Sequence, residues 1–106
     1  TPKPSSAASD VYKRQVQESD LVTTDVWVSM GDESEANERV EIFSDFQVNE
    51  GVLDQAKPDA IFLHCLPAIR GQEISSNLLD DSRSRVWQQA ENRLHAQKGL
   101  LIELLE

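Results

Sequence analysis

The apolar positions of the chain include two runs that predict β-strands, at residues 21–27 and 60–64. The first run is rich in β-branched residues, which favour extended backbone. The second is short and continuously apolar, as is typical of a strand buried in a parallel sheet. A third, briefer strand is predicted over residues 85–87.

Helical patterns separate and follow these strands. Asp32 and Glu35 have the spacing of a capping box and predict a helix that runs to about Phe46. Asn49 can cap a second helix that extends through Ala56. Two further helical segments are predicted, a turn at residues 76–80 and a long helix at residues 88–105. Because strands alternate with helices, we expect an α/β fold: a three-layer, Rossmann-like fragment with a short, mostly parallel sheet flanked by helices.

The first 15 residues lack this pattern. They contain two prolines and a Ser/Ala cluster without apolar periodicity, which predicts a disordered tail. Residues 10–15, DVYKRQ, also match the translation of a transposon end sequence used to build sequencing libraries. We therefore expect residues 1–15 to be adapter-derived and the native protein to start near Val16, which would make the chain a fragment.

Composition narrows the possible functions. The chain has 106 residues, enough for one small domain, and a net charge of -9 from 19 acidic and 10 basic residues. An acidic surface argues against binding to nucleic acid or to an anionic membrane. No apolar run approaches the roughly 20 residues of a membrane span. The single cysteine cannot form an intrachain disulfide, which favours the reducing cytoplasm, and one cysteine with two histidines is little material for a metal site.

Polar and reactive side chains follow each predicted strand. They are Asp25, Ser29 and Met30 after the first strand, His64, Cys65 and Leu66 after the second, and Glu91, Asn92 and Arg93 after the third. In open parallel sheets, ligands bind outside the carboxyl ends of the strands. We therefore expect these three groups to line one crevice.

The side chains in this crevice suggest the chemistry of the ligand. Asp25 offers an anion for an amine, and Ser29 with loop N–H groups can hold a carboxylate. Cys65 can place a thiol or thiolate beside a reacting amine. Arg93 can polarise a carbonyl or pair with a phosphate. Together they predict a pocket for an amino acid beside a polar acceptor group.

Three motifs resemble those of a known family. In chain order they are DVWVSMG (25–31), FLHCLPA (62–68) and WQQAENRLHAQK (87–98). Their order and spacing are similar to the C-terminal portion of ornithine carbamoyltransferase, in the aspartate/ornithine carbamoyltransferase family. The resemblance covers nearly all of the chain after residue 15, and only the last third or so of a complete member. The related aspartate enzymes carry a proline at the position of Cys65, so the resemblance favours the ornithine branch.

The resemblance implies an activity for the complete protein. Residues 16–106 would be the C-terminal part of the ornithine-binding domain with its final helix. The complete enzyme would transfer the carbamoyl group of carbamoyl phosphate to the δ-amine of L-ornithine, giving L-citrulline and phosphate for arginine metabolism, without a cofactor or metal. Complete members form homotrimers. The family's phosphate-binding S-x-R-T-R segment and its N-terminal carbamoyl-phosphate domain are absent from this chain, so we expect the fragment alone to be inactive.

The D-x-x-x-S-M-G motif implies an ornithine-binding loop. In the family its Asp and its Ser-Met pair bind the amino-acid end of ornithine. The resemblance therefore assigns that role to Asp25, Ser29 and Met30.

The other two motifs imply residues between the substrates. The Cys-Leu of H-C-L-P holds the carbamoyl amide through backbone carbonyls, which assigns Cys65 and Leu66. The Arg of E-N-R contacts the carbamoyl oxygen, which assigns Arg93. The predicted catalytic residues are Asp25, Cys65 and Arg93. His64 is open to two interpretations, a functional group or a structural residue that orients the loop through a hydrogen bond.

Three other functions remain open at the level of sequence. The chain could be a stand-alone module that binds an amino acid without catalysis, or belong to a putrescine-type carbamoyltransferase. It could also be a non-functional truncated product that aggregates, because its sheet and last helix lack partners.

Overall fold

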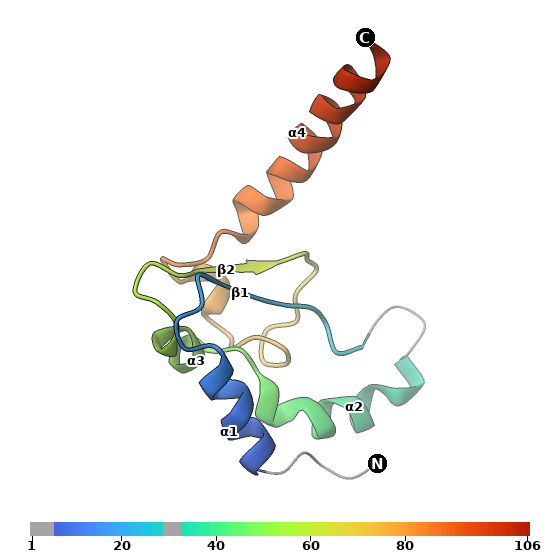
Figure 1. Ribbon diagram of the computed structural model, residues 1–106. Helices are drawn as coiled ribbons and strands as arrows, with labels where there is room; N and C mark the ends of the chain where they lie inside the picture. The colour runs from blue at the N-terminus through green and yellow to red at the C-terminus, as the bar shows by residue number, and fades with distance from the viewer. Residues whose placement is uncertain (1–5, 29–32) are drawn as a thin grey trace.

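A computed structural model describes residues 6–28 and 33–106 of the chain (Figure 1). The helices are α1 (Ser6–Gln15), α2 (Ala36–Phe43), α3 (Glu50–Gln55) and α4 (Val86–Leu105), and the strands are β1 (Leu21–Thr24) and β2 (Ile61–His64). Three short 3-10 turns join them, η1 (Glu33–Glu35), η2 (Ser44–Phe46) and η3 (Leu78–Asp80). The order of strands and helices confirms the predicted α/β fold.

The two strands pair in parallel, with Leu21 opposite Ile61 and Thr24 opposite His64. Side chains alternate between the faces of a strand. Phe62 and His64 are therefore buried on one face of β2, at 0% and 1% exposure, whereas Ile61 and Leu63 point to the other face.

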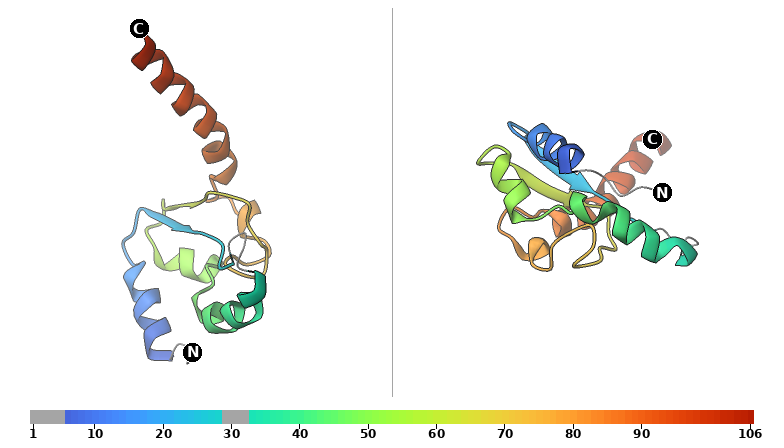
Figure 2. Two further views of the ribbon diagram at one scale, coloured as in Figure 1. Left: turned by 90° about the vertical axis from the view of Figure 1, so that its right-hand side faces the viewer. Right: turned by 90° about the horizontal axis from the view of Figure 1, so that it is seen from below.

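The sheet separates two layers of helix. Figures 1 and 2 show α1, α2 and α3 on one side, while α4 starts against β2 and rises away on the other. The core fills the first side, where Phe62 belongs to the same buried cluster as Val52 and Leu53 of α3 and Leu78 of η3. This arrangement confirms the three layers expected from the sequence.

The predicted third strand at residues 85–87 is wrong. In this region Ser84 forms an isolated parallel bridge to Phe62, and α4 begins at Val86. The Phe62 N–H donates to the Arg83 carbonyl and the Arg85 N–H to the Phe62 carbonyl, both at 2.9 Å. Val86 is the first residue of this helix and is fully buried, so its β-branched side chain packs in the core as part of a helix and not of a strand.

The intermediate helices agree with the sequence. Asn49 caps α3, because its Oδ1 accepts a hydrogen bond from the Val52 N–H at 2.9 Å. The helical turn expected at residues 76–80 is η3. A helix also forms in the predicted range 32–46, although Asp32, the expected first member of its capping box, lies outside the described residues.

Residues 6–15 differ from the predicted disordered tail, because they form helix α1. Tyr12 is half-buried against the core, and its ring lies 5.5 Å from that of Phe46, measured between ring centroids. Val16, just after the helix, is buried. Contact with the rest of the chain thus orders a segment whose own composition does not favour order. The adapter origin of residues 1–15 stays a prediction.

Candidate functional site

The carboxyl ends of β1 and β2 bring Asp25 and Cys65 together. Each residue directly follows its strand, and the register that pairs Thr24 with His64 makes the next residues neighbours. The Cys65 Sγ donates a hydrogen bond to Asp25 Oδ1 at 3.3 Å. The same oxygen accepts the Val26 N–H at 2.7 Å. Both side chains are exposed, so a ligand can reach them.

The surroundings of this pair fix its charge at neutral pH. The Val26 N–H, and after it the Cys65 thiol, lower the pKa of Asp25. Desolvation raises the pKa of Cys65, and the hydrogen bond to the Asp25 carboxylate raises it further, while the charge of Arg93 acts in the opposite direction. These shifts favour the carboxylate form of Asp25 and the thiol form of Cys65.

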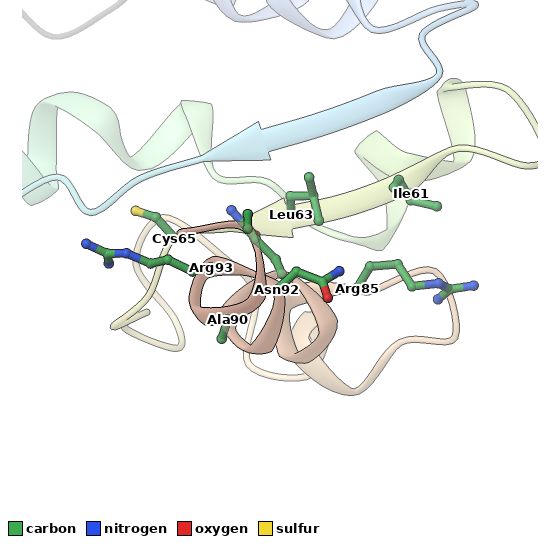
Figure 3. A pocket seen from close by; sticks show the side chains of 9 residues that line it. Ile61, Leu63, Cys65, Arg85, Ala90, Asn92 and Arg93 are labelled. Carbon is green, nitrogen blue, oxygen red and sulfur yellow. The ribbon is translucent and has the colours of Figure 1, made fainter. Parts of the chain in front are cut away.

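A groove of about 620 Å³ lies between the outer face of β2 and the first turns of α4 (Figure 3). Ile61 and Leu63 form its apolar side on β2, and Ala90 contributes from α4. Cys65 and Arg93 lie at the same end of this groove. The structure thus brings together three of the six predicted site residues: Asp25 contacts Cys65, and Cys65 shares the groove with Arg93.

A buried pair shapes the HCLP loop, residues 64–67. The Leu66 N–H donates to His64 Nδ1 at 2.8 Å, so Nδ1 carries no proton. His64 Nε2 then donates to Glu73 Oε1 at 2.9 Å, and both side chains are fully buried. Glu73 Oε1 also accepts the Ile69 N–H at 2.8 Å. These hydrogen bonds agree with the interpretation of His64 as a structural residue that orients the loop.

These bonds hold Leu66 in an unusual backbone conformation. Its φ is +60°, in the left-handed region that side chains with a Cβ rarely adopt. The His64 N–H also donates to Gln89 Oε1 at 3.0 Å, which ties the loop to α4. Leu66, the fourth predicted site residue, is thus placed by contacts from both sides of the sheet.

The sequence analysis missed Glu73. The residue stands nine positions after His64 in an ordinary polar segment, and its side chain is 0% exposed. Nothing in this polar segment marks Glu73 as a partner of His64, and only the fold shows that the loop turns back to place it there.

The other residues expected in the crevice contribute less to the described site. Ser29 and Met30 lie outside the described residues. Glu91 forms an exposed pair with His95 at 3.2 Å on α4. Among the described side chains, no three of His, Cys, Asp and Glu gather closely enough to hold a metal ion. None of the helices in the described part of the chain has the length and apolar character needed to cross a membrane.

Comparison with known proteins agrees with this arrangement. The family described as "Aspartate/ornithine carbamoyltransferase, Asp/Orn binding domain" matches residues 3–104. The chain belongs to this family. Its resemblance to the family, first drawn from three motifs, is thereby confirmed over almost the whole sequence.

Individual relatives are similar in sequence and in structure. The chain is 58% identical over 97 residues to an ornithine carbamoyltransferase of Anoxybacillus flavithermus, covering 92% of this chain and 31% of the relative. It is 62% identical over 86 residues to the anabolic ornithine carbamoyltransferase of Pseudomonas aeruginosa, covering 81% of this chain and 28% of the relative.

The fold matches solved family structures. The ornithine carbamoyltransferase of Pyrococcus furiosus superposes with a TM-score of 0.76 at 53% identity, covering 85% of this chain and 29% of that one. The anabolic enzyme of Campylobacter jejuni superposes with a TM-score of 0.80 at 38% identity, covering 88% of this chain and 31% of that one. The chain thus spans about a third of the length of these relatives.

Proposed function

We propose that the chain is the ornithine-binding portion of an ornithine carbamoyltransferase. The hydrogen bond between the Cys65 thiol and the Asp25 carboxylate carries the proposal, because it places an anion beside a thiol that lines the same groove as Arg93. The ammonium group at the amino-acid end of ornithine fits the carboxylate of Asp25. Relatives that carry the ornithine carbamoyltransferase name reach 62% identity with this chain.

In the complete protein, the proposed reaction joins ornithine to the carbamoyl group. The δ-ammonium first releases one proton to solvent, and the free δ-nitrogen attacks the carbonyl carbon of carbamoyl phosphate. The bond from that carbon to the phosphate oxygen breaks, and the second proton of the nitrogen passes to the departing phosphate. Citrulline and phosphate are the products. Asp25 pairs with the ammonium group at the amino-acid end of ornithine and so holds the substrate while its δ-amine reacts.

The remaining roles follow the family motifs. Arg93 stabilises the negative charge that develops on the carbonyl oxygen during attack. The backbone carbonyls of Cys65 and Leu66 hold the carbamoyl amide, and the bonds from His64 keep that backbone in place before the substrates arrive. Ser29 and Met30 take the amino-acid end of ornithine.

The proposal also covers the part of the complete protein that lies outside this chain. It would supply the carbamoyl-phosphate domain and the homotrimer. Residues 16–106 would be the C-terminal part of the ornithine-binding domain, and the free thiol of Cys65 is compatible with a cytoplasmic location.

Calorimetric titration of the 106-residue chain with L-ornithine tests the binding step. We expect saturable heat that falls sharply in Asp25→Asn, which removes the anion but keeps the shape of the side chain. Putrescine, which lacks the amino-acid end, should bind more weakly, and tighter binding of putrescine would favour the putrescine-type enzyme.

Activity is tested by adding a separately produced carbamoyl-phosphate domain of a relative. Citrulline formed by the mixture, and by neither part alone, supports the enzyme. Ornithine binding without any citrulline from the mixture supports a binding module. Absence of ornithine binding by a folded chain would contradict the proposal.

A further inference from the structure

Helix α2 contacts the segment that follows β1 through an arginine. Arg39 Nη1 donates to the Trp27 carbonyl at 3.2 Å, across 12 residues of sequence. The Nε and Nη2 atoms of the same guanidinium donate to Glu35 Oε2 at 3.1 and 2.9 Å. Glu35 therefore orients the guanidinium, and a rigid planar donor set directs one N–H to the backbone of Trp27.

The ring of Trp27 makes a second contact with the same helix. Its centroid lies 6.1 Å from that of Phe43, with the ring planes inclined by 36°. Phe43 follows Arg39 by four residues, so both lie on one face of α2. Trp27 is thus held at its carbonyl and at its side chain.

The contact between Trp27 and α2 lies close in sequence to Asp25 of the candidate site. The ladder of β1 ends at Thr24, so residues 25–28 run beyond the sheet. Asp25 is the first of them and Trp27 is two residues further. The position of the Asp25 carboxylate therefore depends on how the segment is held at each end, by β1 before it and by α2 after it.

We propose that Arg39 is a positioning residue for amino-acid recognition, which holds the Trp27 carbonyl so that Asp25 faces the ligand and Cys65. This inference rests on the proposed function, because it takes the ligand to be ornithine. Arg39 itself does not touch the ligand. Its effect is on the fixed geometry of the anion.

Three variants of the chain test this role. Arg39→Met keeps the length of the side chain and removes its donors, whereas Arg39→Lys keeps the charge but not the planar fork. The matched control is Lys57→Met, which breaks a similar exposed ion pair, Lys57 with Asp20 at 2.8 Å, at the amino end of the sheet. We expect Arg39→Met to raise the Kd for ornithine about tenfold, Arg39→Lys to raise it less, and the control to leave it unchanged.

A second readout separates positioning from mere stability. The Asp25 carboxylate raises the pKa of the Cys65 thiol, so loss of its fixed position should move the pH profile of Cys65 alkylation to lower pH. Arg39→Met should show this shift at a temperature where circular dichroism finds all variants folded. A variant that only weakens the fold would lower the melting temperature and leave the profile in place.

The outcomes distinguish the two proposals. If the unaltered chain binds ornithine and Arg39→Met changes neither the Kd nor the alkylation profile, the positioning role is overturned and the proposed function stands. If the folded, unaltered chain binds no ornithine, the proposed function and the role in recognition both fail. A shifted alkylation profile would then show only that Arg39 fixes Asp25.

Discussion

At the scale of single residues, the buried Glu73 decides the shape of the candidate site. One carboxylate oxygen of Glu73 accepts hydrogen bonds from His64 Nε2 and from the Ile69 N–H. The other ring nitrogen of His64, Nδ1, accepts the Leu66 N–H. A buried donor without an acceptor costs more than an ordinary hydrogen bond gains. A change at the buried Glu73 should therefore affect the loop at Leu66, because the two residues are linked through His64.

Replacement of Glu73 by alanine should destabilise the chain by about 2–5 kcal/mol, because the buried His64 Nε2 and the part-buried Ile69 N–H lose their acceptor. Glu73→Gln is the control: its amide oxygen can accept both bonds, so it should lose less stability than Glu73→Ala, although its buried amide NH2 replaces an oxygen that has no partner. Urea unfolding followed by circular dichroism measures the difference. Equal losses in the two variants would show that the accepted hydrogen bonds are not what makes Glu73 important.

At the scale of elements, local signals predict what local interactions stabilise. The cap of α3 could be predicted because its acceptor, Asn49, and its donor, Val52, lie within four residues of each other. Residues 85–87 and α1 show the opposite case. Val86 has the β-branched side chain of a strand but is buried from the first turn of a helix, and α1 packs through Tyr12 against a distant part of the chain.

The cap gives the prediction at this scale. Asn49→Ala should cost about 0.5–2 kcal/mol of stability, because the Val52 N–H loses its acceptor. Asn49→Asp keeps an acceptor oxygen and should retain the stability. Hydrogen exchange at the Val52 amide measures the effect directly. We expect faster exchange in Asn49→Ala alone, and unchanged exchange in that variant would contradict the role of the cap.

At the scale of the whole molecule, the far end of α4 stands away from the core (Figure 1). Its large apolar side chains include Leu94, Leu101 and Leu104, which are 65%, 56% and 69% exposed. Contiguous apolar surface of this kind is uncommon on monomeric proteins and favours association. Residues 88–105 thus form a helix, as their apolar periodicity predicts, but the described part of the chain does not cover its apolar side chains.

This surface predicts that the 106-residue chain self-associates as its concentration rises. Leu101→Glu combined with Leu104→Glu should shift sedimentation profiles toward the monomer. Gln88→Glu combined with Gln97→Glu adds the same charge to exposed polar positions of α4 and should leave association unchanged. Association that persists in the leucine variant would place the contact elsewhere on the molecule.

The sequence by itself determined the α/β class, the two parallel strands, the cap of α3 and the residues that follow these two strands. These depend on periodicity, turn chemistry and motifs, which are local properties. The tertiary structure decided that Asp25 meets Cys65, that Glu73 holds His64 and that Arg39 reaches Trp27, at separations of 40, 9 and 12 residues. Burial and hydrogen bonding between such residues exist only after the chain has folded back on itself, so no local pattern encodes them.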